Sequence, residues 1–395
     1  MTPMPDSRQR VLLVAGEASG DLHGARLVRQ LRAARPELRI QAVGARRLRE
    51  AGAEILCDCS RFSALGVYEA LKRVPRLLLV LRRLRALLAS DPPDLLVLID
   101  FGAFNMRLLR FAHERGIKTL YYIPPGCWVK RMVSATRRVA ALADYIATPF
   151  PWSERLLREA GGRAKFVGHP LLDLLEELPP AEEPPPGEES PIVALLPGSR
   201  DAEVRHILPL IARALRLVLR RHPKLRPVVS CAPTIARPYL EHQVRRWLPE
   251  AEITEDTYRL LRGARVGVIA SGSATLEAAI VGLPMVVVYA GSWVSWIQYL
   301  LFVRGRIKYI ALPNILADRE LVPERYGERG SPEEIAAEVT RLIEDRSARD
   351  TMKGELKRVV SELGTPGAAR RTAELALALL EGRGGPAESA DAIAL

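Results

Sequence analysis

Cysteine is scarce in this 395-residue sequence, and long apolar runs are missing. The cysteines form no CxxC pair, so a structural zinc site and a disulfide framework are both disfavoured, and a reducing compartment is expected. Only a short apolar run precedes Gly16 and Glu17, which is typical of a first β-strand rather than of a signal peptide. Hydrophobic residues make up 48% and charged residues 26%, as in folded globular proteins, so a mainly disordered chain is excluded. The four cysteines are Cys57, Cys59, Cys127 and Cys231.

Acidic residues are in short supply only in the first part of the chain. Residues 1–150 carry 25 Lys and Arg against 13 Asp and Glu, whereas the remaining residues carry 33 of each. The net charge of +12 therefore belongs to the N-terminal part. This indicates an anionic partner such as a phosphorylated substrate or an anionic membrane surface, or else solvated Arg-rich helix faces. No recognition motif for nucleic acid accompanies the charge, so nucleic-acid binding is not expected.

Short apolar runs alternate with helical patterns such as 22–35 and 106–115. Aliphatic runs of this length are typical of parallel strands that helices cover on both faces. The alternation predicts an α/β protein with doubly wound parallel sheets. The predicted strands are 11–15, 40–43, 95–99, 119–123, 145–147 and 165–167, followed by 192–196, 227–230, 266–270, 285–289 and 309–311.

A segment rich in proline and glutamate, 178–191, interrupts this pattern and is typical of a linker. The sequence therefore predicts an N-terminal domain over 1–177 and a C-terminal domain over 192–380. The last part of the second domain, 331–380, is predicted to be helical, with Ser331 as a helix cap. Residues 381–395 are expected to form a disordered tail.

Two candidate sites follow predicted strands of the N-terminal domain. Small residues after the first strand allow a tight turn at the strand end, where doubly wound sheets bind ligands. In that turn, Ser19 and Asp21 are candidate helix caps, and Glu17 and His23 are candidate groups lining the site. Asp100 directly follows the strand 95–99, where its carboxylate can act as a general base or cap a helix.

The C-terminal domain has a candidate phosphate site after its first predicted strand. Gly198 permits close approach of the backbone, Ser199 can donate a hydrogen bond, and Arg200 supplies a cation with two donor groups. A helix that begins near Glu203 would direct its positive end to the same place, which suits a diphosphate. The chain has no GxxxxGK[ST] loop, so phosphoryl transfer of that type is disfavoured.

A second small-residue turn, 270–277, lies between a predicted strand and a helix. Its backbone N–H groups can hold a phosphate and Glu277 can bind ribose hydroxyls, although a capping serine with an acidic first turn is the alternative. Asn314 and Glu320 offer further polar recognition.

Six segments together resemble the lipid-A-disaccharide synthase family, whose members are inverting glycosyltransferases with the GT-B fold. The segments cover roughly residues 11–330 in family order, and the combination of AGEASGD with LLPGSR is highly specific. They are AGEASGDLHGA (15–25), IDF..FN (99–105), VGHPL (167–171), LLPGSR..EV (195–204), SGSATLE (271–277) and PNILADRELVPE (313–324).

The resemblance implies two Rossmann-like domains that face a cleft, with the lipid acceptor held by the first and a UDP-sugar by the second. The implied reaction joins UDP-2,3-diacylglucosamine to 2,3-diacylglucosamine 1-phosphate, forming a β-1,6 linkage and releasing UDP. Inversion needs one displacement, and no DxD-like motif occurs in the segments expected at the cleft, so no metal or other cofactor is expected. A homodimer, built through the C-terminal domains, and attachment to the cytoplasmic face of the inner membrane are also implied.

Individual roles follow from the matching positions. Asp100 is the candidate base for the acceptor's 6-hydroxyl, with Glu17 and His23 as further catalytic candidates. The expected substrate-binding residues are Ser19, Asp21, Asn105 and Trp128. The expected nucleotide-binding residues are Gly198, Ser199, Arg200, Ser271, Gly272, Ser273, Thr275, Glu277, Asn314 and Glu320.

Two segments combine apolar and basic side chains in a way that suits an anionic lipid surface. The first, 67–88, has five consecutive aliphatic residues among arginines, far fewer than the ~20 needed to span a bilayer. The second, 293–309, places aromatic residues beside basic ones. Core packing or a dimer contact is the alternative for both segments. The expected membrane contacts are Leu77, Leu78, Leu81, Arg82 and Arg83.

The sequence departs from the family pattern in the half expected to bind the acceptor. Ala103 stands where the family has a second carboxylate, and the stretch 122–130 lacks two serines and one tryptophan of the family pattern. Two alternatives therefore stay open. One is a UDP-sugar transferase or epimerase with another substrate, and the other is a catalytically weak protein that binds nucleotide or lipid.

Overall fold

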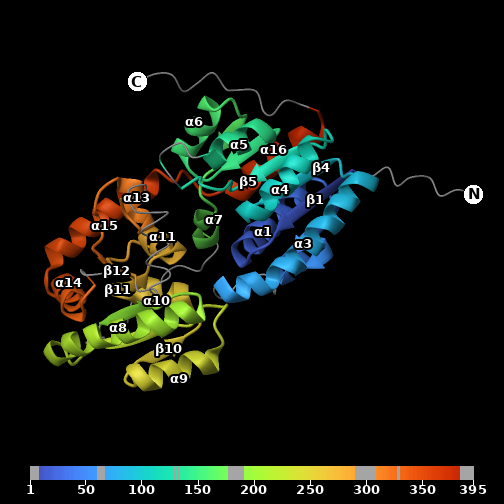
Figure 1. Cartoon of the computed structure of the whole chain (residues 1–395). Helices are drawn as coiled ribbons and strands as arrows, with labels where there is room; N and C mark the ends of the chain where they lie inside the picture. Colours follow the sequence, from blue (N-terminus) through green and yellow to red (C-terminus); the bar gives the residue numbers. More distant parts are fainter. Residues whose placement is uncertain are drawn as a thin grey trace, which may run out of the picture. The chain divides into compact units, whose positions relative to one another are not determined.

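The computed structural model describes residues 9–59, 67–128, 130, 134–176, 191–289, 308–326 and 330–382 (Figure 1). The chain divides into two compact units, Leu175–Glu362 and a discontinuous unit of Met1–Leu174 with Leu363–Leu395. Most of the expected linker, the tail from residue 383 and most of the second candidate membrane segment lie outside the described residues. None of the described helices is long and apolar enough to cross a bilayer.

The first unit is built on a parallel sheet with seven strands in the described part of the chain, in the order β3-β2-β1-β4-β5-β6-β7. Its central strands are buried on both faces because helices cover both sides. The strands are β1 (Arg10–Ala15), β2 (Arg39–Gly44), β3 (Glu54–Asp58), β4 (Leu95–Ile99), β5 (Thr119–Tyr122), β6 (Tyr145–Thr148) and β7 (Ala164–Phe166). The helices are α1 (Ala18–Ala34), α2 (Arg46–Glu50), α3 (Val67–Ser90), α4 (Gly102–His113), α5 (Ser134–Leu142), α6 (Pro151–Glu159), α7 (Pro170–Glu176) and α16 (Ala368–Leu380).

The second unit repeats this architecture with six parallel strands among the residues described, in the order β10-β9-β8-β11-β12-β13. The strands are β8 (Ile192–Leu196), β9 (Arg226–Ser230), β10 (Glu252–Thr254), β11 (Val266–Ala270), β12 (Met285–Tyr289) and β13 (Glu324–Tyr326). The helices are α8 (Asp201–Arg221), α9 (Arg237–Trp247), α10 (Thr257–Gly263), α11 (Ser273–Ile280), α13 (Leu312–Ala317), α14 (Pro332–Glu344) and α15 (Arg346–Ser361). The predicted α/β class with two doubly wound parallel sheets is confirmed.

Three edge strands, β3, β10 and β13, were not predicted from the sequence. All three contain charged residues and are only partly buried, so they lack the apolar run that marks the central strands. The predicted strand 309–311 is wrong, because these residues form a bend that leads into α13. The predicted cap at Ser331 is confirmed, because its side chain accepts a hydrogen bond from the Glu334 N–H in a capping box.

The last helix belongs to the first unit, which differs from the expected C-terminal domain of 192–380. Figure 1 shows α16, in red, beside the elements of the first sheet, and α16 packs against α1 and β4. Its buried face, with Ala373 and Ala376, joins the same core cluster as Leu27 of α1 and Val97 of β4. The small side chains of α16 allow the helix to lie close to its neighbours.

Candidate functional site

The candidate base Asp100 lies at the carboxyl end of β4, in a strained backbone conformation. Asp100 and Phe101 both adopt left-handed φ angles, 49° and 50°, which side-chain-bearing residues seldom adopt. Three hydrogen bonds hold the backbone of Asp100. Its N–H donates to the Tyr122 carbonyl (3.1 Å), and its carbonyl accepts from the Tyr121 hydroxyl (3.0 Å) and the Asn105 amide (2.9 Å). The backbone therefore fixes where the carboxylate lies.

Ser19 meets this carboxylate from the turn after β1. Its hydroxyl donates to Asp100 Oδ2 at 3.3 Å, so the structure brings together two residues that the sequence predicted separately. Burial raises the pKa of Asp100, and hydrogen bonds from the Phe101 N–H and Ser19 oppose this rise. A carboxylate with a raised pKa is a stronger base than one in water.

A small residue is needed where this turn leaves β1. A Cβ atom at Gly16 would lie 2.2 Å from the ring of Phe101, so any larger residue would displace Phe101. Phe101 in turn stacks on Phe104, with ring centroids 5.0 Å apart. Glu17 is exposed at the N-terminus of α1, where its side chain makes no cap hydrogen bond.

Two expected substrate-binding residues of the first unit instead hold the backbone together. Asp21 is 5% exposed, and its carboxylate accepts the N–H groups of Ala45 (2.7 Å), Arg47 (3.1 Å) and Leu48 (3.3 Å) at the start of α2. Asn105 is 0% exposed and its amide donates to the carbonyls of Val14 (3.3 Å) and Ile99 (3.2 Å) as well as to Asp100. We therefore assign both side chains a structural role.

Asn105 also does not begin its helix, because α4 starts earlier, at Gly102 after Phe101. The helix therefore begins before the helical pattern predicted over 106–115, because the left-handed turn at Asp100 and Phe101 already ends the strand and starts the helix.

His23, on α1, is partly buried, and its buried Nδ1 atom makes no hydrogen bond in the described part of the protein. Burial first, and then the nearby charge of Arg26, lower the pKa of His23 to about 4. His169, before α7, is a close neighbour whose pKa burial lowers to about 3. Both rings are therefore neutral at pH 7. Trp128 is 38% exposed and stays a candidate contact for the acceptor.

In the second unit, the turn that is predicted to bind a phosphate makes hydrogen bonds to the carboxylate of Glu203. Gly198 has a φ of 122°, and a Cβ there would lie 2.5 Å from Glu203. Glu203 accepts the Ser199 N–H at 2.8 Å and Arg200 Nη1 at 2.6 Å. Arg200 is largely exposed and lies at the N-terminus of α8. The same backbone N–H and guanidinium can bind a phosphate oxygen.

The second predicted turn, at the carboxyl end of β11, has the expected shape. Gly272 has a φ of 152°, and the Thr275 hydroxyl donates to its carbonyl at 2.7 Å. The Ser271 hydroxyl donates to the Ile310 carbonyl at 2.9 Å. Ser273 is exposed at the first position of α11. The turn thus joins the segment before α13 to the strand end.

Glu277 of α11 is partly buried, and burial raises its pKa. Hydrogen bonds with Tyr258 and Ser273 oppose this rise. Tyr258, on α10, is a member of this site that sequence reasoning missed, because no pattern links α10 to α11.

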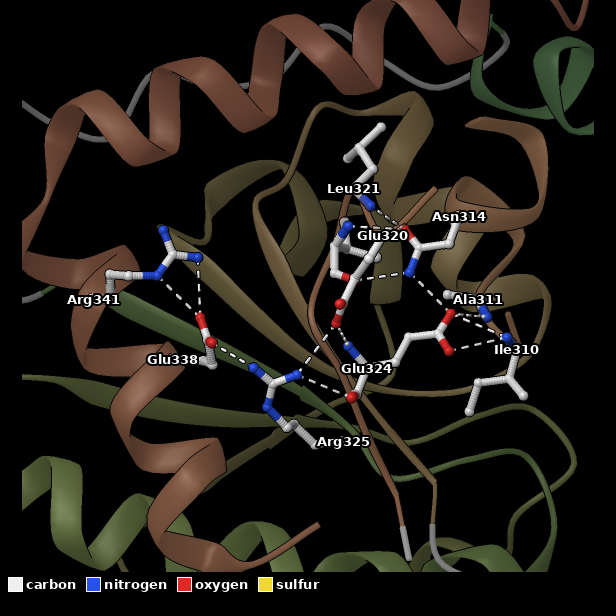
Figure 2. A network of polar contacts seen from close by, with 10 residues as sticks. Ile310, Ala311, Asn314, Glu320, Leu321, Glu324, Arg325, Glu338 and Arg341 are labelled. Atoms are coloured by element: carbon white, nitrogen blue, oxygen red, sulfur yellow. Dashed lines mark hydrogen bonds and ion pairs between the residues drawn. The ribbon is translucent and has the colours of Figure 1, made fainter. Parts of the chain in front are cut away.

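Asn314 and Glu320, the remaining expected nucleotide contacts, belong to a polar network around Glu324 (Figure 2). Asn314 is 0% exposed, and its oxygen accepts the N–H groups of Leu321 (2.7 Å) and Val322 (2.8 Å). Its nitrogen donates to the Val322 carbonyl (2.8 Å) and to Glu324 Oε1 (2.9 Å). These bonds use the full capacity of the amide, so Asn314 is structural here. Glu320 accepts from Arg325 at 3.3 Å and is more exposed.

The candidate membrane helix α3 has two different faces. Leu78 and Leu79 are each 49% exposed, beside exposed Arg82 and Arg83. Leu81 was expected at the membrane, but it is 5% exposed and packs in the core with the sheet. Leu77 also packs against that core. The outward face therefore contains only part of the expected contact set.

Comparison with known proteins identifies the family. The model of the lipid-A-disaccharide synthetase family matches residues 11–379. The lipid-A-disaccharide synthase of Anaeromyxobacter dehalogenans (strain 2CP-C) is 37% identical over 385 residues, 95% of this chain and 99% of the relative.

Two solved structures share the fold at low sequence identity. One is UDP-GlcNAc 2-epimerase from Neisseria meningitidis bound to UDP-GlcNAc, with a TM-score of 0.59 and 13% identity over 95% of this chain and 100% of that one. The other is CalG4, the calicheamicin glycosyltransferase, with a TM-score of 0.57 and 19% identity over 92% of this chain and 97% of that one. With its two parallel-sheet units and its match over residues 11–379, the chain belongs to the lipid-A-disaccharide synthase family, glycosyltransferases of the GT-B fold that form the disaccharide of lipid A.

Proposed function

We propose that this protein transfers 2,3-diacylglucosamine from UDP to the 6-hydroxyl of 2,3-diacylglucosamine 1-phosphate. The observation that carries the proposal is Asp100, a partly buried carboxylate with a raised pKa on a fixed, strained turn beside Ser19. Family membership supports the donor and acceptor classes. The products are a β-1,6-linked disaccharide 1-phosphate and UDP.

The reaction is a single displacement with inversion. Asp100 takes the proton of the 6-hydroxyl as the new O6–C1 bond forms and the bond between C1 and the UDP oxygen breaks. Arg200 and the backbone N–H groups of the turns at Ser199 and at Gly272 and Ser273 stabilise the negative charge on the departing UDP. Metal independence is part of this proposal, and undiminished turnover in EDTA is its expected result.

The first experiment is a transfer assay with the donor in detergent, with and without the acceptor. UDP release and a disaccharide product that both require the acceptor would support the proposal. UDP binding without any product would mean that the acceptor half has a different substrate or that the protein is a weak catalyst.

The Asp100→Asn variant tests the base. We expect kcat to fall by about 10²–10⁴, the usual contribution of general-base catalysis, while the affinity for UDP stays unchanged. Asp94→Asn is the matched control, because Asp94 lies at the other end of β4 and contacts the Arg10 N–H. Full activity in Asp100→Asn would exclude Asp100 as the base.

One observation favours a second function, either transfer to a different acceptor or UDP-sugar epimerisation. Ala103 is exposed on the first turn of α4, at the position where the family pattern has a second carboxylate. One solved structure with the same fold is named for UDP-GlcNAc 2-epimerase. Acceptor-independent conversion of a UDP-sugar would support epimerisation over transfer.

A further inference from the structure

Glu324, the first residue of β13, places a buried carboxylate in the second unit. It is 5% exposed, and within the described residues its carboxylate forms no ion pair. Burial raises the pKa of Glu324, and the hydrogen bonds that it accepts oppose this rise. A buried carboxylate is costly unless several donors compensate it, so its partners show what it holds in place.

Those partners lie in the segment that leads into α13 (Figure 2). Glu324 Oε1 accepts the N–H groups of Ile310 (3.0 Å) and Ala311 (2.8 Å) and the Asn314 amide (2.9 Å). Oε2 accepts the Ile310 N–H at 3.1 Å. One carboxylate therefore fixes two consecutive peptides and the amide that holds residues 321 and 322.

The peptide between Ile310 and Ala311 links Glu324 to the turn after β11. In a planar trans peptide the N–H and C=O groups point in opposite directions. Glu324 holds the Ala311 N–H on one side, and the Ile310 carbonyl on the other side accepts the Ser271 hydroxyl at 2.9 Å. Ser271 also donates its N–H to the carbonyl of Val288 in β12 at 3.0 Å. The turn after β11 is therefore held both by β12 and by the segment before α13.

We propose that Glu324 is a positioning residue for donor binding, because it holds the Ile310–Ala311 peptide against the turn at Ser271. The inference rests on the proposed function, in which that turn binds the UDP part of the donor. Glu324 itself does not touch the donor. Its carboxylate acts through the peptide, and Asn314 supports the same arrangement from inside the network.

The test is UDP binding to the full chain of Glu324→Gln, measured by calorimetry. The glutamine keeps the size of the side chain but replaces one oxygen with an N–H₂ donor that faces the Ile310 N–H. We expect the dissociation constant for UDP to rise about tenfold, the change that follows from ~1.4 kcal/mol. The Michaelis constant for the donor should rise with it, while that for the acceptor stays constant.

Glu338→Gln is the matched control. Glu338 belongs to the same network and pairs with Arg325 and Arg341, but it makes no bond to the Ile310–Ala311 peptide. We expect wild-type UDP affinity for this variant. Equal weakening in both variants would show a general loss of structure and overturn the proposal.

Calorimetry also separates folding from positioning, because the binding stoichiometry reports the folded fraction and the dissociation constant reports the site. An unchanged dissociation constant in Glu324→Gln, with wild-type protein binding UDP, would overturn the proposal. Failure of the wild-type protein to bind UDP would instead overturn the proposed function.

Ser271→Ala provides a second variant that leaves the buried carboxylate intact. Because Glu324 acts through the bond between Ile310 and Ser271, the effects of Ser271→Ala and Glu324→Gln on the UDP dissociation constant should not multiply in the double variant. Fully multiplicative effects, or an unchanged dissociation constant in Ser271→Ala alone, would overturn this route.

Discussion

At the scale of residues, His23 and His169 are two partly buried histidines that are neutral when the protein is folded. Their folded pKa values are about 4 and about 3, whereas an exposed histidine titrates near 6.5. Below about pH 6.5 the unfolded chain therefore binds more protons than the folded one. Stability is lost as the pH falls from about 6.5 towards 4.

The variant His23→Asn should remove part of this pH dependence. We expect the free energy of unfolding of the wild type to fall more steeply between pH 7 and pH 5 than that of the variant, by at most ~1.4 kcal/mol per pH unit for one proton. Urea unfolding at several pH values measures it. His242→Asn is the control, because His242 is exposed on α9. Identical slopes in wild type and His23→Asn would contradict the prediction.

The residues that sequence reasoning placed best are those whose backbone defines the site. Asp100 at the end of a strand, Gly198 and Gly272 all lie in the turns predicted for them. Polar side chains after a strand were harder to interpret, because a cap and a ligand contact look alike in the sequence. Asp21 and Asn314 hold backbone groups, and only the folded chain shows which N–H groups reach them.

At the scale of elements, α3 combines a core face and an outward face. Leu78 and Arg82 are four residues apart, as are Leu79 and Arg83, so apolar and basic side chains share one side of the helix. Peripheral attachment to an anionic membrane through this side remains our proposal. The other side of α3, which includes Leu81, packs in the core of the first unit.

The double variant Leu78→Ser/Leu79→Ser tests the attachment. Each half-exposed leucine contributes about 1 kcal/mol when a lipid surface covers it, so we expect affinity for vesicles of phosphatidylethanolamine and phosphatidylglycerol to fall at least tenfold. Co-sedimentation measures the bound fraction. Leu217→Ser is the control, because Leu217 is 36% exposed on α8 of the other unit. Unchanged binding in the double variant would argue against α3.

A second element, α16, depends on one carboxylate at its N-terminus. Asp173 of α7 accepts the N–H groups of Gly367 (2.6 Å), Ala368 (3.0 Å) and Ala369 (3.0 Å). This arrangement satisfies N–H groups that a helix leaves without partners at its start.

Asp173→Ala should loosen α16 by about 1–3 kcal/mol, because three N–H groups at the start of the helix lose their acceptor. Hydrogen exchange measures this, with faster exchange expected in α16 and little change in α15. Asp345→Ala is the control, because Asp345 caps α15 in the other unit. Faster exchange spread evenly over both units would contradict a local role for Asp173.

Central strands were predicted well because they are continuous apolar runs, and β4, β8, β11 and β12 agree with the predicted bounds. Edge strands such as β3 and β13 contain charged residues, so only their pairing with a neighbouring strand in the folded protein identifies them. The sequence also did not predict the unit to which α16 belongs, because a helical pattern does not indicate which sheet its apolar face covers.

At the scale of the whole molecule, the first unit is discontinuous and the second is continuous. The chain leaves the first sheet after Leu174 and returns at Leu363. Residues just before two strands of the first sheet also contact α16: Lys118 Nζ donates to the Leu379 carbonyl at 3.0 Å, and the Gln9 amide donates to the Leu380 carbonyl at 3.3 Å.

A chain that ends after Glu362 should therefore lose the first unit and keep the second. We expect differential scanning calorimetry to show one remaining cooperative transition, from residues 175–362, because their core is intact. A chain that ends after Gly382 is the control and should keep both units, because it retains every described contact of α16. Two unchanged transitions in the shorter chain would show that α16 is dispensable.

The same discontinuity sets the order of events on the ribosome. The seven described strands of the first sheet emerge before residue 175, yet α16, which covers α1 and β4, is made only after the second unit. The nascent chain thus holds an uncovered apolar surface while nearly 200 further residues are synthesised. The inserted unit can fold on emergence, whereas the first unit exposes an aggregation-prone apolar surface until α16 arrives.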